Sequence, residues 1–327
     1  MANAVKSTVL VRSVAETSLS AVVRDCMDRF DWERWVGPGS TVVIKPNVCS
    51  AVPEVVLGGD TNPAVVRAVC EVLQTRTRRI YIGESRHLRQ TPWDAFKAAG
   101  YVELAEELGV ELVNFSDGPF TVVDCPPAGS IKLPSLLLEA DAYINIPVLK
   151  THALTYFTGA LKNQWGCVPE HLDRLRHHRK IDALLCSLQR ILHPHLIIMD
   201  GTFGMEGRGP VAGRVRRLDA LLASSDPVAM DATAMRLVGL DPQRAGHVTL
   251  AAEKGLGHSR ESQIAVEGDW KRCQTRFEPP PRDFANTTMF FLTSHDWFTK
   301  KIYANDRIYY PIRDLVKFMR RTGAFGG

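Results

Sequence analysis

Runs of apolar residues alternate with amphipathic segments along most of the chain. Short apolar runs rich in β-branched side chains are typical of strands buried on both faces of a parallel sheet. Apolar residues at helical spacing, as at Leu19, Val22, Val23 and Cys26, are typical of a helix with one buried face. The alternation predicts an α/β fold with a doubly wound, mostly parallel sheet and helices on both faces.

The boundaries of the predicted elements follow from these runs and from turn and capping signals. The predicted strands are 7–12, 41–44, 79–82, 110–115, 142–146 and 196–199. The predicted helices are 18–35, 63–74, 92–108, 227–238 and 247–253.

The 327 residues are enough for one large α/β domain. We expect a main domain over residues 1–275 and a proline-hinged tail over residues 276–327, because aromatic and basic residues become frequent after the proline run. This C-terminal appendage is expected to act as a lid or packing arm. A homodimer contact and a weak membrane-surface helix are the alternatives.

Composition narrows the class of protein. The chain is 45% hydrophobic and 23% charged, which excludes disordered and collagen-like chains. Its net charge of +4 favours a small anionic substrate and does not require nucleic acid as a partner. No apolar run reaches the roughly 18 residues that span a bilayer, so we expect no transmembrane segment.

The seven cysteines include no C-x-x-C pair, so we expect no iron–sulfur cluster and no zinc ribbon. Their irregular spacing favours reduced thiols, and the N-terminus shows no signal peptide. Both features predict a cytoplasmic protein.

The first candidate site follows the strand at 142–146, where Lys150, His152 and Lys162 lie close together in the sequence. Functional residues of doubly wound sheets gather beyond the carboxyl ends of strands. Lysines can neutralise a carboxylate or phosphate, a desolvated lysine can act as a base, and a histidine can move protons or bind a metal. The neighbouring residues expected to contact a cofactor or substrate are Thr158, Gly159 and Asn163.

Two further candidates contribute carboxylates. Asp200 and Glu206 lie in a predicted glycine-rich stretch over residues 200–210, a strand-end carboxylate followed by a loop that also contains Gly207 and Gly209. They could hold a divalent cation or exchange protons, and a long structural turn is the alternative. Asp231 lies in an otherwise apolar helix and needs a lysine, an arginine or a metal as partner, unless it is a helix-start carboxylate.

At these residues the sequence resembles the family catalogued as domain of unknown function 362. The matching motifs occur in family order: Ile44-Lys45-Pro46-Asn47, Thr61-x-Pro63, Gly83-Glu84-Ser85, Pro147-x-x-Lys150-Thr151-His152, Thr158-Gly159-Ala160-Leu161-Lys162-Asn163-x-x-Gly166, Asp200-Gly201, Glu206-Gly207-x-Gly209-Pro210 and Asp226-Pro227-x-x-x-Asp231. The resemblance implies a single α/β domain with no assured activity. The motifs add cofactor-binding candidates at Lys45, Asn47, Thr61, Glu84 and Ser85. Some relatives carry ferredoxin-like cysteine runs that this chain lacks.

Residues 152–166 are also similar in layout to the lysine loop of nickel-dependent lactate racemases. This likeness implies Lys162 as the residue that tethers a nickel-pincer nucleotide and His152 as the matching histidine.

A different group of charges lies in the basic stretch 171–180, which we interpret as a solvated face. Contact with a phosphate is the alternative for that stretch.

We therefore expect an enzyme that acts on a small anionic substrate by Lys- and His-assisted proton transfer or rearrangement, in the manner of an isomerase or racemase. The expected catalytic residues are Lys150, His152, Lys162, Asp200 and Glu206, with Asp231 and His152 as candidate metal ligands. The first alternative is a redox protein that binds an organic cofactor or metal. The second is a non-catalytic binding module.

Overall fold

The structure is a computed structural model that describes residues 6–87, 90–281, 292, 295–303, 305, 307–311 and 314–315. Its strands are β1 (Ser7–Ser13), β2 (Val42–Pro46), β3 (Ile80–Glu84), β4 (Glu111–Asn114), β5 (Phe120–Asp124), β6 (Ser130–Pro134), β7 (Ala142–Ile146), β8 (Val148–His152), β9 (Tyr156–Thr158), β10 (Leu196–Glu206), β11 (Arg214–Ser224) and β12 (Ile264–Gly268).

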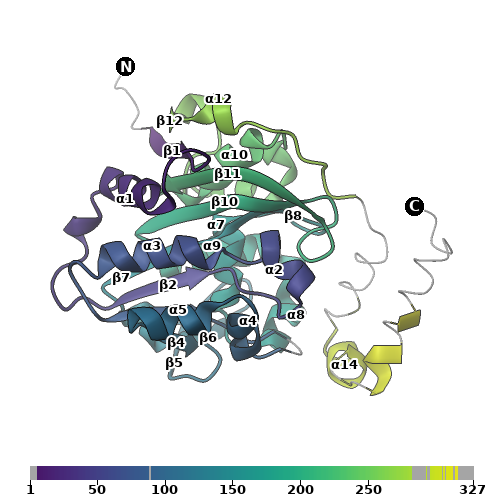
Figure 1. Ribbon diagram of the computed structural model, residues 1–327. Helices are drawn as coiled ribbons and strands as arrows, with labels where there is room; N and C mark the ends of the chain where they lie inside the picture. The colour runs from purple at the N-terminus through teal and green to yellow at the C-terminus, as the bar shows by residue number, and fades with distance from the viewer. Residues whose placement is uncertain are drawn as a thin grey trace.

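The helices connect these strands and cover them (Figure 1). The α-helices are α1 (Leu19–Arg29), α2 (Pro53–Gly59), α3 (Pro63–Leu73), α4 (Pro92–Ala98), α5 (Tyr101–Leu108), α6 (Ser135–Glu139), α7 (Ala160–Asn163), α8 (His171–His177), α9 (Ile181–Leu192), α10 (Pro227–Leu237), α11 (Gly246–Glu253), α12 (Trp270–Cys273) and α14 (Asp296–Phe298). Short helical turns are η1 (Trp32–Arg34), η2 (Gln164–Cys167), η3 (His178–Lys180), η4 (Pro242–Arg244), η5 (Glu261–Gln263) and η6 (Thr299–Tyr303).

The main sheet has the strand order β12-β1-β11-β10-β7-β2-β3-β4, and β8 and β9 extend it beside β10. The strands from β10 through β7, β2 and β3 to β4 are parallel, whereas β11 runs antiparallel to both of its neighbours. Strands β5 and β6 form a separate antiparallel pair. The predicted α/β class with a doubly wound, mostly parallel sheet is confirmed.

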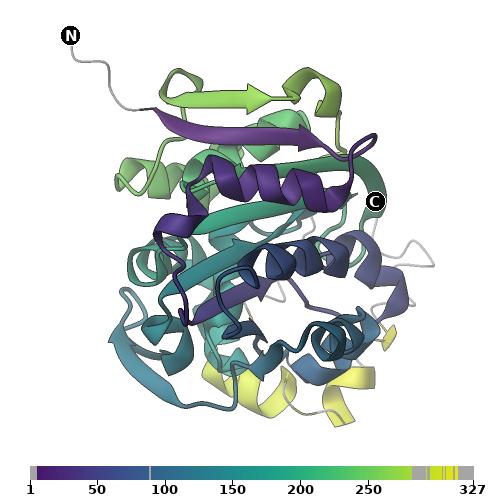
Figure 2. The ribbon, with the colours of Figure 1, turned by 60° about the vertical axis from the view of Figure 1, so that its left-hand side comes forward.

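Helices pack on both faces of the sheet because successive strand residues point to opposite faces. In β10, Ile198 joins the core under α1, α3 and α5, and Ile197 joins the core under α10 and α11. Figure 2 shows α1 and α3 crossing one face of the sheet. A third group of buried residues lies between α9 and the β5–β6 pair.

The predicted loop up to residue 210 is wrong as far as Glu206, because β10 continues through these residues and pairs with β11. Two glycines explain the continuation. A Cβ atom at Gly201 would lie 2.9 Å from the Ala220 carbonyl oxygen, and one at Gly204 would lie 2.6 Å from the Leu149 carbonyl oxygen. The glycines thus allow neighbouring strands to approach closely.

Two predicted helices are shorter or divided. The helix predicted over 18–35 ends at Arg29, after which η1 follows. The helix predicted over 92–108 is two helices, since Gly100 adopts a left-handed conformation with φ of 81° between α4 and α5. The capping box predicted from Thr91 and Asp94 is present at the start of α4.

The residues after Cys273 remain attached to the sheet domain up to Glu278. The amide of Phe277 donates to the Val238 carbonyl, and its side chain is 2% exposed. Farther along, η6 lies next to α8. Much of the predicted aromatic and basic tail, including Phe318, lies outside the described residues.

Candidate active site

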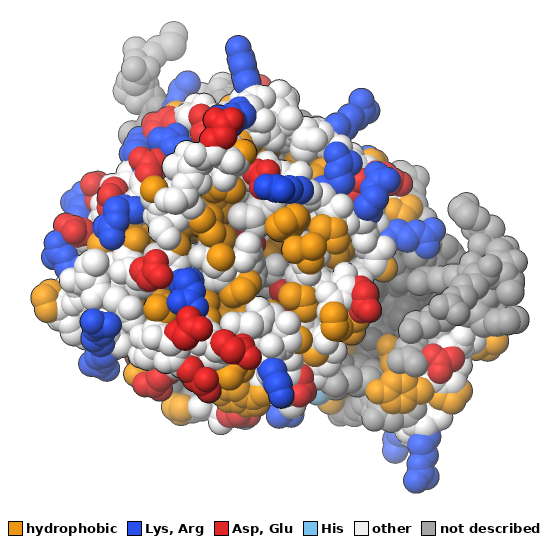
Figure 3. All heavy atoms as spheres, viewed as in Figure 1, with side chains coloured by type: hydrophobic (Ala, Val, Ile, Leu, Met, Phe, Trp, Pro, Cys, Tyr) orange, Lys and Arg blue, Asp and Glu red, His pale blue; other side chains and the backbone are white. Residues whose placement is uncertain are grey.

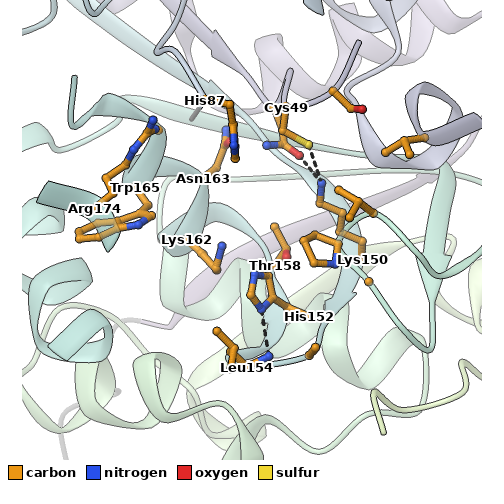
Figure 4. Close-up of a pocket in the computed structure, with 18 of the residues that line it drawn as sticks. Cys49, His87, Lys150, His152, Leu154, Thr158, Lys162, Asn163, Trp165 and Arg174 are labelled. Carbon is orange, nitrogen blue, oxygen red and sulfur yellow. Dashed lines mark hydrogen bonds between the residues drawn. The ribbon is translucent and has the colours of Figure 1, made fainter. Parts of the chain in front are cut away.

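A cavity of about 630 Å³ lies beyond the carboxyl ends of β2 and β3, next to β8 and β9 (Figure 4). The predicted site residues that line it are Lys45, Asn47, Glu84, Lys150, His152, Thr158, Lys162, Asn163 and Gly209. Residues that the sequence did not single out also line it, among them Cys49, His87, Trp165 and Arg208. Its volume is typical of a small-molecule site.

The cavity is strongly cationic. Among the described residues that line it, Lys45, Lys150, Lys162, Arg174 and Arg208 carry positive charge, and Glu84 is the one carboxylate. Such an excess of positive charge inside a pocket favours an anionic ligand.

Lys45 and Glu84 form a buried ion pair at the ends of β2 and β3. The ammonium lies 2.5 Å from Glu84 Oε2 and 2.6 Å from the Pro46 carbonyl oxygen, and a longer contact reaches Asn163. A Cβ atom at Gly166 would lie 2.6 Å from the Glu84 carboxylate, so this position needs glycine. The charge of Lys45 is therefore already compensated by protein.

Lys150 is held by three acceptors. Its ammonium donates to Asn47 Oδ1 and to the Gly59 carbonyl oxygen, both at 2.6 Å, and lies 3.6 Å from Cys49 Sγ. An ammonium has three N–H donors, so all are engaged. Because none of these three partners is a carboxylate, Lys150 contributes positive charge to the cavity while its amine stays fixed.

Lys162, on α7, differs from both. Within the described part of the chain, no group accepts a hydrogen bond from its ammonium, which points into the cavity (Figure 4). Burial and the nearby charges of Lys150 and Arg174 lower the pKa of Lys162 to about 7, against a smaller opposing effect of Cys49. A substantial fraction of its amine is therefore neutral near pH 7 and able to accept a proton.

His152 has its tautomer fixed by the backbone. Its Nδ1 accepts hydrogen bonds from the amides of Leu154 and Thr155, at 3.1 and 3.3 Å. Burial, followed by the charge of Lys162, lowers the pKa of His152 well below its ordinary value, so the ring is neutral. A neutral ring that accepts at Nδ1 carries its proton on Nε2. His152 is therefore a hydrogen-bond donor at Nε2.

Thr158, on β9, has an unused polar group in the same cavity. Its side chain is 3% exposed, and its hydroxyl has no hydrogen-bond partner among the residues that the structure describes. Buried hydroxyls are normally paired, so this orphaned group at a cavity wall fits a polar ligand.

The basic stretch 171–180 is not only a solvated face. Arg174 is 9% exposed, lines the cavity and donates to the Arg86 carbonyl. His171 and His178 line the cavity with it. Contact with a phosphate, the alternative for this stretch, is thus sterically available.

Asp200 lies outside the described wall of the cavity. It accepts hydrogen bonds from the Asn62 amide and from the amide and hydroxyl of Thr202. Burial raises the pKa of Asp200 to about 6, despite these hydrogen bonds. The carboxylate therefore links the start of α3 to β10 and stabilises the contact between them.

Glu206 is also placed away from the described cavity wall. It accepts from Arg214, from Arg216 and from the Glu278 amide. Burial opposes ionisation, but these hydrogen bonds and the Arg216 charge lower the pKa of Glu206 overall. Its hydrogen bonds connect the end of the β10–β11 pair to the backbone at Glu278.

Asp231 lies behind the cavity and accepts the first amides of α7. The distances are 2.6 Å to the Ala160 nitrogen and 3.1 Å to the Leu161 nitrogen. Burial raises the pKa of Asp231 to about 7, against these hydrogen bonds. Asp231 therefore positions the helix that carries Lys162.

The other predicted cofactor-binding residues support the cavity from behind. Thr61 accepts from the Asn47 amide and donates to the Ile146 carbonyl, and Ser85 donates to the Gly166 carbonyl. Gly159 leaves room for Asp231, and Gly207 accepts from Thr151. None of these four is among the described residues that line the cavity.

The donor set does not fit a metal ion. Asp231 accepts the leading amides of α7 and is not among the described residues that line the cavity, and the Nε2–H of His152 offers no lone pair. Across the described ranges, no three His, Cys, Asp or Glu side chains are grouped closely enough to hold a metal. The layout of residues 152–166 implied His152 as the histidine that matches the nickel-pincer site, but in this tautomer its Nε2 carries a proton and its Nδ1 accepts two amides.

The residues that the sequence did not single out have recognisable signals. Trp165 stands between matching residues of the motif that ends at Gly166, and Arg208 stands between Gly207 and Gly209. Cys49 follows the Asn47 motif by two residues. Each would be found by including the unmatched positions beside the motifs.

Known proteins resemble this chain in sequence and in structure. A thylakoid-associated protein from Synechocystis sp. is 31% identical over 264 residues, which cover 77% of this chain and 80% of that protein. Among solved structures, the lactate racemase apoprotein from Thermoanaerobacterium thermosaccharolyticum aligns at 10% identity and a TM-score of 0.45, covering 89% of this chain and 91% of that chain. A Thermotoga maritima protein aligns at 12% identity and a TM-score of 0.35, covering 73% and 59%. At these scores neither structural alignment supports an argument about function.

Within the described ranges, no helix is both long and apolar enough to cross a bilayer.

The model of the family described as Domain of unknown function (DUF362) matches residues 42–236, which is more than half of the chain and includes the motifs that line the cavity. The chain therefore belongs to this family.

Proposed function

We propose that this protein is an enzyme that binds a small anionic substrate in the cavity and transfers a proton, with Lys162 as the base. The observation that carries the proposal is the unpartnered Lys162 amine, which faces a cationic cavity and has a pKa of about 7. A base with a pKa near the working pH is largely present in its neutral, proton-accepting form and still binds the proton well enough to remove it from a substrate.

The neighbouring residues give this base a setting. The charges of Lys150 and Arg174 attract the carboxylate or phosphate of the substrate. The amine of Lys162 takes a proton from the substrate carbon, and the Nε2–H of His152 stabilises the oxygen on which negative charge develops. The reaction is then of the isomerase or racemase type, because the same proton can return at another position or face.

Deuterium exchange against a panel of small anions tests this proposal. The full chain is incubated in D₂O with 2-hydroxy and 2-amino carboxylates and with phosphorylated hydroxyketones, and loss of C–H signals is followed by ¹H NMR. We expect exchange of at least one compound, which Lys162→Ala slows by about 100-fold or more. The exposed lysine variant Lys97→Ala serves as the matched control.

Exchange that persists in both Lys162→Ala and His152→Ala would refute the assignment of these residues. The cytoplasmic location predicted from the cysteines stays a prediction, since the Synechocystis relative is described as thylakoid-associated.

A further inference from the structure

The cavity has an apolar mouth in addition to its cationic interior. Val52 and Val55 line it beside and within α2, and Val211 and Ala212 line it from the segment between β10 and β11. Val52 is 43% exposed and Val211 is 49% exposed. Figure 3 shows hydrophobic side chains gathered over α2. Large apolar side chains left in solvent beside a pocket mark a contact surface for a ligand.

The α2 side of the mouth is fixed to the strands below it. A Cβ atom at Gly58 would lie 2.7 Å from the Gly204 carbonyl oxygen, so α2 sits directly on β10. The Lys150 ammonium holds the Gly59 carbonyl at the end of the same helix. One side chain therefore links the cationic interior to the helix that bears the apolar rim.

The second edge of the mouth, which carries Val211 and Ala212, is tied to β8. The Thr151 hydroxyl donates to the Gly207 carbonyl at 2.9 Å, and the Ala153 amide donates to the Gly209 carbonyl at 3.0 Å. The segment that carries Val211 is thus anchored beside Lys150 and His152. Both apolar edges are held in fixed positions relative to the cations.

We propose that the ligand of this cavity is an anionic amphiphile, a carboxylate or phosphate head joined to an apolar chain or ring. The head lies against Lys150, Lys162 and Arg174, and the apolar part leaves between Val52 and Val211. A fully polar anion would bury the interior charges but leave both valines in water. The placement of the head rests on the proposed function, whereas the apolar part rests on the mouth alone.

Calorimetric titration of the full chain with two homologous series tests this proposal. The probes are n-alkyl phosphates and n-alkyl carboxylates from ethyl to octyl, with inorganic phosphate as the headgroup alone. We expect Kd to fall about fourfold per methylene group while the chain passes the mouth, as expected for burial of apolar surface. Comparison of the two series at equal chain length identifies the preferred head.

Isosteric variants locate the apolar contact. In the double variant Val52→Thr and Val211→Thr, we expect binding of the octyl ligands to weaken by about tenfold, because a hydroxyl must then be desolvated. Binding of inorganic phosphate should not change. Val266→Thr, at an exposed valine of β12, is the matched control, and thermal unfolding verifies that each variant is folded.

The outcomes separate the two proposals. A Kd independent of chain length, or octyl binding unaffected by the double variant, would refute the amphiphilic ligand. A chain-length dependence that persists while Lys162→Gln leaves every headgroup affinity unchanged would refute the role of Lys162 and retain the apolar contact. Failure of every probe to bind would refute both.

Discussion

Three lysines face one cavity, and the acceptors around each ammonium decide what each can do. Lys45 is neutralised by Glu84, and Lys150 is fixed by three hydrogen bonds. Lys162 has no acceptor among the described residues, so its charged form lacks the compensation that Lys45 and Lys150 receive. Residue type alone does not separate these roles. Burial lowers the pKa of a lysine enough for it to act as a base only when no carboxylate or hydrogen-bond acceptor stabilises its charged form.

At this scale we expect Lys162 to titrate near neutrality. Reductive methylation with ¹³C-formaldehyde and NMR detection should give one lysine signal with a midpoint near 7, and Lys162→Met should lack it. Substituting Lys150→Met removes the neighbouring charge and should raise that midpoint, since a like charge disfavours the ammonium. A midpoint near 10 for Lys162 in the wild-type protein would contradict this account.

At the scale of the element, the start of α7 is built from two distant positions. Gly159 has no side chain, and a Cβ atom there would lie 2.1 Å from Asp231 Oδ1. The vacant space lets the carboxylate accept both leading amides of the helix. The helix start then fixes where Lys162 enters the cavity, which explains why Asp231 acts on the site without lining it.

Replacement of Asp231 by Asn should change how stability depends on pH. The folded pKa is raised from 3.8 to about 7, so between these values the folded protein holds a proton that the unfolded chain releases. The contribution of Asp231 to the free energy of unfolding therefore falls as pH rises from about 4 to about 7. Asp231→Asn should remove this contribution, which is on the order of 4 kcal/mol, as measured by urea unfolding at several pH values.

The exposed variant Asp117→Asn is the control for this measurement, and it should keep the wild-type slope. The buried carboxyls of Asp200 and Asp60 shift in the same direction, but they are present in all three proteins and cancel in the comparison. Equal slopes for wild type and Asp231→Asn would show that Asp231 is not protonated in the folded state.

At the scale of the whole molecule, the segment after Cys273 closes the sheet domain. Phe277 packs in the core beside α10, and the Glu278 amide donates to Glu206 at 3.0 Å. We therefore propose that the main domain extends a few residues beyond the boundary at 275 that the proline run suggested.

Truncation separates this segment from the tail. A chain ending after Pro281 should retain the urea midpoint of the full chain, whereas one ending after Cys273 should lose stability. Phe277→Ala in the full chain should cost about 3–5 kcal/mol, because it empties a buried aromatic site. Equal unfolding midpoints for the two truncated chains would exclude the role given to Phe277.

The local sequence determined the elements whose signals lie within a few residues. The buried strand 142–146 and the capping box at Thr91 were predictable, because apolar period and capping depend on neighbours in the chain. The motifs also located Lys150, His152 and Lys162 at one cavity wall. The sequence did not predict β8, β9, β11 or β12. Strands β11 and β12 both pair with β1 near the other end of the chain, whereas β8 and β9 are short strands that pair with each other beside β10.

The tertiary structure alone decided which charged residues are free. Asp200, Glu206 and Asp231 have the residue types of a catalytic site, yet each is engaged by amides or guanidinium groups from elsewhere in the fold. Arg174 has the sequence context of a solvated face and lies buried at the cavity. The reactivity of a charged side chain depends on its desolvation and on its hydrogen-bond and ion-pair partners. Many of these partners are far apart in the sequence, as in the contact between Lys150 and Asn47. The sequence thus determined the charges and the main strands, whereas folding determined which of the charges remained unpaired.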